Sequence, residues 1–157
     1  MGGIIHREDQ FIPHLIVSDG LAALEFYKDV FGAVDGHNMM SPDGQRLMHG
    51  EIELDGHKLF LSDWFAPSDG GTLGSPEKLG GTCVRVTLMV DDADAVMDRA
   101  VARDSHVLMP VQDMFWGARY GKFIDPFGHE WGINQQETEM TPDETGTEVE
   151  KLISKNE

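Results

Sequence analysis

The order of apolar and polar positions divides the chain into short segments with either strand or helix periodicity. Residues 11–17 are apolar and branched, which predicts a strand, and residues 21–31 carry apolar side chains at helical spacing. Ser18 or Asp19 is placed to cap that helix, and Gly32 is placed to end it. Further strands are expected at residues 33–40, 45–54 and 57–64.

The Asp55-Gly56 step predicts a tight hairpin, which fixes the faces of the strands on either side. With Leu54 opposite His57, alternation along each strand sorts the side chains into opposite faces. One face is apolar and should pack under the helix: Met48, Ile52, Leu54, Leu59 and Leu61. The other is polar and aromatic, and suits either solvent or a wet cavity: His49, Glu51, Glu53, Lys58, Phe60, Ser62 and Trp64.

Residues 65–83 are rich in Gly, Pro, Ser and Thr, which predicts a linker loop. The first pattern then repeats, with a strand at 84–90, a helix capped by Asp91 or Asp92, and strands at 106–114, 119–125 and 129–136. The predicted segments are an N-terminal arm at 1–10, a first module at 11–64, the linker at 65–83, a second module at 84–136 and an acidic tail at 137–157. Thr141 and Glu144 form a capping box in that tail, but a frayed tail is the expectation.

The stretch DMFWGARYGKFIDPFGHEW, from Asp113 to Trp131, predicts a hairpin that closes over something. Its turn is Asp125-Pro126-Phe127-Gly128, because proline presets one central dihedral angle and glycine accepts a positive one. Trp116 and Arg119 flank Gly117, which lets the backbone approach another group closely. The ordinary alternative is a pair of core aromatics beside a solvated arginine.

The formal charge of −16, from 28 acidic and 12 basic residues, makes nucleic acid and anionic membranes poor partners because both would be repelled. This acidity suits a high-salt cytoplasm and an ordinary one equally well. The lone Cys83 cannot form an internal disulfide, so the reducing cytoplasm is the expected location. No segment approaches the length of a membrane span.

Several local motifs together resemble those of a known family. They are Glu25-Phe26-Tyr27 and Phe31-Gly32 in the first module, and Trp116-Gly117 with Asp125-Pro126-Phe127-Gly128-His129-Glu130-Trp131 in the second. They resemble the vicinal oxygen chelate superfamily of glyoxalases, bleomycin-resistance proteins and dioxygenases, and within it the PhnB-like branch. The resemblance implies an α+β fold in which two βαβββ modules form a cup-shaped mixed sheet around a central cavity, a small-molecule ligand, and often a homodimer.

Enzymes of that superfamily hold a divalent metal through His, Glu or Gln at strand positions that the resemblance places at Ile12, Phe60, Arg85 and Gly132. None of these side chains can bind a hard cation, which needs oxygen or imidazole ligands. We therefore expect no metal at the family positions and no other cofactor. Glyoxalase-type isomerase activity is correspondingly disfavoured.

The same resemblance puts Phe60 on the cavity side, and strand alternation then assigns its neighbours. Trp131 and Ile133 are left to the core. The predicted ligand-binding residues are His14, His49, Glu51, Phe60, Ser62, Trp64, Arg85, Thr87, Trp116, Arg119 and Glu130. The favoured function is therefore metal-free binding of a small organic molecule.

Within this set, Arg85 or Arg119 suits a bidentate clamp on an anionic or carbonyl-bearing ligand. Arg85 has an alternative role, because Glu51 or Glu130 could hold it in an ion pair.

Enzymatic alternatives also stay open. His14, His49 and Glu51 or Glu130 have the composition of a displaced metal site of the dioxygenase, lyase or isomerase type. His49 with Glu51 or Glu130 instead suits metal-free acid-base catalysis, with the carboxylate holding one tautomer. Neither alternative selects a substrate.

Overall fold

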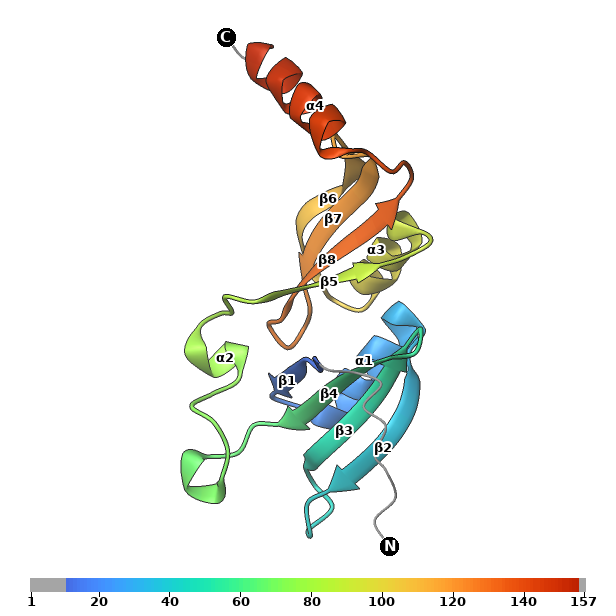
Figure 1. Ribbon diagram of the computed structural model, residues 1–157. Coiled ribbons are helices and arrows are strands. Elements are labelled where there is room, and N and C mark those ends of the chain that lie inside the picture. The colour runs from blue at the N-terminus through green and yellow to red at the C-terminus, as the bar shows by residue number, and fades with distance from the viewer. Residues whose placement is uncertain (1–10, 156–157) are drawn as a thin grey trace, which may run out of the picture. The chain divides into compact units, whose positions relative to one another are not determined.

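The computed structural model describes residues 11–155, so the predicted N-terminal arm at 1–10 lies outside the described residues. The chain divides into two compact units, Met1–Gly81 and Thr82–Glu157 (Figure 1). Each unit contains a four-stranded mixed sheet and a helix packed against it.

The first unit follows the predicted order of strand, helix and three strands. Its elements are β1 (His14–Val17), α1 (Gly20–Phe31), β2 (Val34–Met40), β3 (Leu47–Leu54) and β4 (His57–Asp63). The sheet order is β1-β4-β3-β2, with β1 parallel to β4 and the other pairs antiparallel. The predicted linker contains a short 3-10 helix, Pro67–Asp69, and a short helix α2, Pro76–Leu79.

Helix α1 begins and ends where the sequence predicts. Asp19 is its N-cap, because Asp19 Oδ1 accepts a hydrogen bond of 3.0 Å from the backbone N–H of Ala22. Gly32 ends it with a φ of 73°, the left-handed conformation that glycine adopts without strain. The apolar stripe of α1 packs on β3 and β4, and the buried side chains of this layer are Val17, Leu24, Phe26, Tyr27, Val30, Leu47, Ile52 and Leu61.

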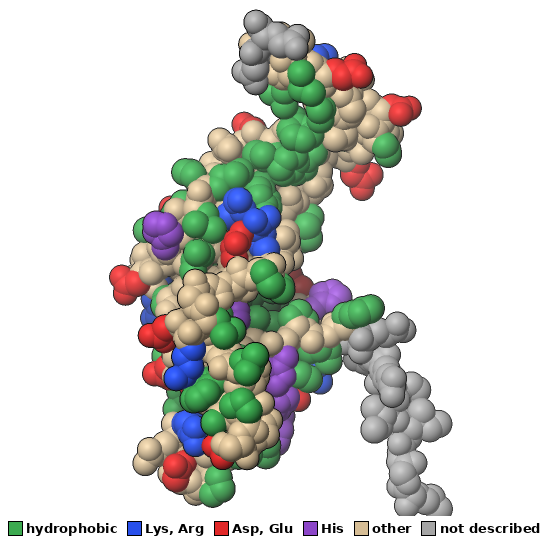
Figure 2. Space-filling model, turned by 90° about the vertical axis from the view of Figure 1, so that its left-hand side faces the viewer, with side chains coloured by type: hydrophobic (Ala, Val, Ile, Leu, Met, Phe, Trp, Pro, Cys, Tyr) green, Lys and Arg blue, Asp and Glu red, His purple; other side chains and the backbone are tan. Residues whose placement is uncertain are grey.

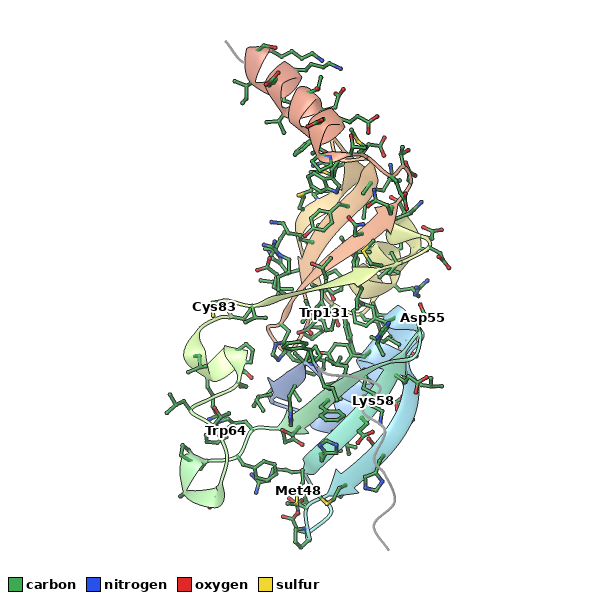
Figure 3. The ribbon with its side chains drawn as sticks, viewed as in Figure 1. Met48, Asp55, Lys58, Trp64, Cys83 and Trp131 are labelled. Carbon is green, nitrogen blue, oxygen red and sulfur yellow. The ribbon has the colours of Figure 1, made fainter. Side chains whose placement is uncertain are left out.

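The hairpin of β3 and β4 has the predicted register, with Leu54 paired to His57 and Glu51 paired to Phe60. The predicted position of Met48 in the apolar core is wrong. A bulge shifts the register of β3 against β2, so that Met39 pairs with His49 while the next residue pairs with Leu47. Leu47 is therefore fully buried, whereas Met48, near the start of β3 (Figure 3), is 43% exposed.

The second unit repeats this order with β5 (Arg85–Met89), α3 (Ala93–Ala102), β6 (His106–Met114), β7 (Ala118–Ile124) and β8 (Glu130–Gln136). Its sheet order, β5-β8-β7-β6, matches that of the first unit element for element. Trp131 and Ile133 are fully buried, as predicted. The Asp125 turn is held by its own carboxylate, which accepts hydrogen bonds from the backbone N–H of Phe127 and from the Trp131 indole.

The corner between first strand and helix shows the repeat in atomic detail. Asp19 and Asp92 have N-cap dihedral angles of φ −146°, ψ 97° and φ −144°, ψ 97°. In both units a side chain from the end of the last strand, β4 or β8, accepts a hydrogen bond from the first backbone N–H group of the helix. Asp63 accepts a hydrogen bond from Gly20 N, and Gln135 accepts one from Ala93 N, both at 2.9 Å. The predicted α+β fold of two βαβββ modules is confirmed, while the cup and its central cavity stay a prediction.

The acidic tail is not frayed where the structure describes it, so that expectation is wrong. Helix α4 spans Pro142–Ser154 and begins at the capping box, in which Thr141 Oγ1 accepts from Glu144 N and Glu144 Oε2 accepts from Thr141 N. Among residues 11–155, no helix is both long and apolar enough to cross a membrane.

Candidate functional site

Several of the predicted ligand-binding residues of the first unit lie together on its sheet. Their side chains belong to β1, β3 and β4, and we call this set the first polar face: His14, His49, Glu51, Phe60 and Ser62. His14 is the strand partner of Phe60, and the His49 ring lies 4.7 Å from the Phe60 ring, centroid to centroid. The His14 and His49 rings are 6.1 Å apart. Figure 2 shows histidine side chains gathered along one side of this unit.

Hydrogen bonds fix the imidazoles of the first polar face. His14 Nε2 lies 3.2 Å from Ser62 Oγ, and His49 Nε2 lies 3.2 Å from Glu51 Oε1. Lys58 adds a bond of 3.4 Å from its ammonium group to the other oxygen of Glu51. Strand alternation predicts Lys58 on this side of the hairpin, but Lys58 is not among the predicted ligand-binding residues.

Burial and charge set the protonation states. Burial lowers the pKa of His14 below its ordinary value of 6.5, and the nearby charge of His49 lowers it further. The hydrogen bond with His49 lowers the pKa of the Glu51 carboxyl, and the bond from Lys58 adds to this effect. At neutral pH the face therefore combines an uncharged imidazole, an ionised carboxylate and an aromatic ring.

Trp64 does not join the first polar face. It follows the last residue of β4, where strand alternation no longer decides its direction, and it lies at the strand end beside the loop that carries α2 (Figure 3). Its indole Nε1–H donates a 2.9 Å hydrogen bond to the carbonyl of Thr72. The Lys78 ammonium lies 4.1 Å from its ring centroid.

A second polar face lies on the sheet of the other unit, formed by Arg85, Thr87, Tyr120, Glu130 and Gly132. Arg85 Nε donates a 2.5 Å hydrogen bond to Glu130 Oε1, so the ion-pair alternative for Arg85 holds with Glu130 as its partner. This bond raises the pKa of the Arg85 guanidinium. A Cβ atom at Gly132 would lie 2.6 Å from the Tyr120 hydroxyl and 2.8 Å from Thr87 Oγ1, so these groups fill the space that glycine leaves.

Tyr120 is not among the predicted ligand-binding residues, because from the sequence its aromatic side chain indicates only a strand. Its place in β7, opposite Asn134 of β8, was a signal that could have found it. Trp116 lies near the same face, since its ring centroid is 5.8 Å from that of Tyr120.

Arg119 lies on the other side of the second sheet. Its guanidinium forms ion pairs with Asp94 of α3 at 2.8 Å and with Asp113 of β6 at 2.6 Å. Since α3 packs on that side, Arg119 joins the helix to the sheet and is not placed beside Arg85. The Arg119 guanidinium thus already has two carboxylate partners, and its role as a ligand clamp stays a prediction.

The residues present do not fit the superfamily's metal. Phe60 pairs with His14 in the first unit as Gly132 pairs with Thr87 in the second, so Phe60 and Gly132 occupy equivalent positions. These positions offer a hydrocarbon ring and no side chain, and the Arg85 guanidinium is a cation already bound to Glu130. No group of three or more His, Cys, Asp or Glu residues within 11–155 is placed to hold an ion.

The displaced metal site of His14, His49 and Glu51 is therefore not assembled. Instead, His14 is hydrogen-bonded to Ser62, and His49 is hydrogen-bonded to Glu51.

Comparison with known proteins gives a family match over most of the chain. The model of the Glyoxalase/Bleomycin resistance protein/Dioxygenase superfamily matches residues 9–133. An uncharacterized protein from Mycobacterium bovis is 38% identical over 140 residues, which cover 89% of this chain and 91% of that protein.

Solved structures agree in fold. Protein PA1353 from Pseudomonas aeruginosa superposes with a TM-score of 0.66 at 22% identity, covering 83% of this chain and 100% of its own. The PhnB protein from Bacillus cereus has a TM-score of 0.61 at 17% identity, covering 81% and 99%.

Proposed function

The chain belongs to the Glyoxalase/Bleomycin resistance protein/Dioxygenase superfamily, and on that premise we propose that it binds a small organic molecule on its first polar face without a metal. We further propose that it belongs to the PhnB-like branch. Its Trp116-Gly117 and Asp125–Trp131 motifs and its structural similarity to the Bacillus cereus PhnB protein support that assignment.

The observation that carries the proposal is the cluster of His14, His49 and Phe60 rings on the sheet. Apolar residues such as Leu59 and Leu61 of the same strand are buried on the side that packs under α1, so the ring cluster is not needed for the core. Ligand sites combine aromatic walls with a few convergent polar groups, as this face does.

The chemistry of the face favours an uncharged or weakly basic planar ligand. Phe60 offers a ring for stacking, while the uncharged His14 imidazole can donate or accept a hydrogen bond. The ionised Glu51 disfavours an anion next to His49.

Metal-free acid-base catalysis is a second candidate, favoured by the His49–Glu51 hydrogen bond. Because Glu51 occupies Nε2, the other ring nitrogen of His49 is the one that would exchange a proton with a bound molecule. Under this candidate His49 and Glu51 are the catalytic pair.

The test is a screen of small planar compounds, followed by NMR of the histidine rings. Compounds that bind should shift the NMR signals of the His14 and His49 rings. Phe60→Leu should weaken the binding of these compounds by about tenfold, because the stacking contact is lost. His49→Gln should weaken binding, while His106→Gln is the matched control on β6. Hits that bind with full affinity to Phe60→Leu and His49→Gln alike would refute a site on this face. Turnover of a hit that stops in His49→Gln while binding remains would select the catalytic candidate.

We also propose a cytoplasmic homodimer. The free thiol of Cys83 suits a reducing compartment. Strand β2 lies at a sheet edge and exposes Val34 and Met39, at 62% and 46%, and an apolar edge is a template for pairing with a second chain. Light scattering should give twice the chain mass, and Val34→Lys should shift it to the monomer. A parent protein that scatters as a monomer would remove this part of the proposal.

A further inference from the structure

The first unit contains a polar pocket that is separate from the first polar face. It lies where β4 ends, next to the corner between β1 and α1, the segment entering β3 and the start of α2. Its volume is about 670 Å³, within the range of ligand pockets. The lining residues that matter for binding are Arg46, Asp63, Trp64, Ser75, Glu77 and Lys78.

Asp63 builds one wall of this pocket. It is 7% exposed, and its carboxylate accepts hydrogen bonds from Gly20 N at 2.9 Å and from Leu47 N at 2.6 Å. Asp19, also in the lining, caps α1. These carboxylates are engaged by backbone N–H groups, so their role in the pocket is structural.

The basic side chains of the pocket are placed differently from most others in this acidic chain. The Arg46 guanidinium carbon lies 4.2 Å from the Phe65 ring centroid, and the Lys78 ammonium lies 4.1 Å from that of Trp64. Within residues 11–155 neither forms an ion pair of 4.0 Å or less, although Arg46 interacts electrostatically with Asp43, whereas Lys28, Lys58 and Arg119 all form such pairs. Both charged groups are thus held on aromatic faces with donors left for another partner.

Ser75 points independently to a missing partner. It lines the pocket, it is 1% exposed, and its hydroxyl has no hydrogen-bond partner in the described part of the chain. Although it precedes α2, its side chain does not cap that helix. A buried hydroxyl without a partner lowers stability, so a ligand that supplies an acceptor would relieve the loss.

We propose that this pocket binds a small organic carboxylate, with the carboxylate on Arg46 and Lys78 and the Ser75 hydroxyl as a further donor. Asp19, Asp63 and Glu77 also line the pocket, so a monoanion is favoured over a phosphate dianion, which these acids would repel more strongly. The inference goes beyond the proposed function, because it uses none of the residues of the first polar face.

Benzoate and benzamide are suitable probes because they share shape and differ in charge. The Trp64 indole N–H signal, assigned by its loss in Trp64→Phe, reports on the pocket in NMR titrations at constant ionic strength. Benzoate should shift it saturably at millimolar concentration, with affinity about tenfold higher than that of benzamide. Equal affinities, or no saturable shift with benzoate, would overturn the proposal. Inorganic phosphate that binds as well as benzoate would overturn the choice of a monoanion.

Matched variants separate pocket charge from total charge. Lys78→Gln should weaken benzoate binding by about tenfold, while Lys151→Gln in α4 changes the net charge equally and should leave it unchanged. Ser75→Ala should raise the melting temperature of the ligand-free protein yet weaken benzoate binding, a combination that a purely structural serine would not show. Full affinity in Lys78→Gln would refute the site. His49→Gln changes the first polar face and leaves the pocket intact, so this variant should bind benzoate normally. Failure of this proposal can therefore be told apart from failure of the proposed function.

Discussion

Single residues on the first polar face have electrostatic roles that can be measured. His14 is the clearest, because burial and the charge of His49 both lower its pKa below 6.5. Glu51, Glu53 and Lys58 are the other charged groups on this side of β3 and β4, with Glu51 bonded to His49 and to Lys58. The uncharged state of His14 is therefore a property of the folded sheet.

The free energy of unfolding should decrease as the pH decreases, because of His14. The unfolded chain binds this proton more readily than the folded chain, so stability is lost as pH falls through 6.5 towards the lowered pKa and then levels off. Urea unfolding at a series of pH values should show a shallower fall in His14→Gln than in the parent protein. His106→Gln should keep the parent's slope, and an equal change in both variants would contradict the assignment.

Asp63 should matter for stability far more than an exposed aspartate. In Asp63→Asn an amide N–H₂ would face one of the backbone donors, Gly20 N or Leu47 N, and leave it unsatisfied. We expect a loss of about 2–4 kcal/mol in the free energy of unfolding. Asp55→Asn, in the hairpin turn where φ is 47°, should be neutral because asparagine tolerates that conformation. Chemical denaturation measures both, and similar effects would refute the role of Asp63.

At the scale of elements, the hairpin between β6 and β7 depends on one backbone position. Gly117 has a φ of 79°, and a Cβ atom there would lie 2.6 Å from the Thr138 carbonyl oxygen. Gly44 also has a positive φ, 69°, but an added Cβ would meet nothing within 4 Å. Steric contact and backbone strain can thus be separated by comparing the two glycines.

Gly117→Ala should destabilise the protein by about 2–4 kcal/mol, since strain and a backbone clash combine. Gly44→Ala introduces only the backbone strain of a positive φ angle, without a clash, and should lower the free energy of unfolding by about 1 kcal/mol. Thermal and urea unfolding of both variants supply the comparison. Equal losses would show that the contact with Thr138 relaxes without cost.

Local chemistry explains which elements were predictable. The Gly32 end and the Leu54–His57 register depend on neighbours in sequence and were predicted, and the Asp19 and Asp92 caps are each one of the two adjacent candidates that the sequence offers. The burial of Leu47 in place of Met48 depends on a bulge opposite β2, which alternation alone cannot reveal.

The candidate site was predictable only in part for the same reason. The family resemblance and strand alternation put His14 and Phe60 on the same side of the sheet, whereas their direct pairing depends on the contact of β1 with β4, which the sequence does not predict. Arg119 is held by Asp94, a partner 25 residues away in sequence, and Trp64 lies beyond the strand whose alternation was used to place it. Asp63 could have been recognised, because the predicted register put a carboxylate on the apolar face with Leu59 and Leu61.

At the scale of the whole molecule, the absence of suitable ligands at the family's metal positions should make the protein indifferent to chelators. Extended treatment with EDTA should leave the melting temperature and the affinity for any hit on the first polar face unchanged, because no described cluster of side chains holds an ion. Metal analysis of protein purified without chelator should find far less than one ion per chain. A stoichiometric ion whose removal lowers the melting temperature would contradict the metal-free proposal.

The equivalent positions of Asp63 and Gln135 have a consequence for substitutions. Each ties the start of a helix to the last strand of its own sheet, one with a carboxylate and the other with an amide. Since each joint lies within its own unit, a substitution at one position leaves the hydrogen bond at the other in place. The Asp63 carboxylate also accepts a second bond, from Leu47 N, so a substitution there would disturb the entry to β3 as well as the start of α1.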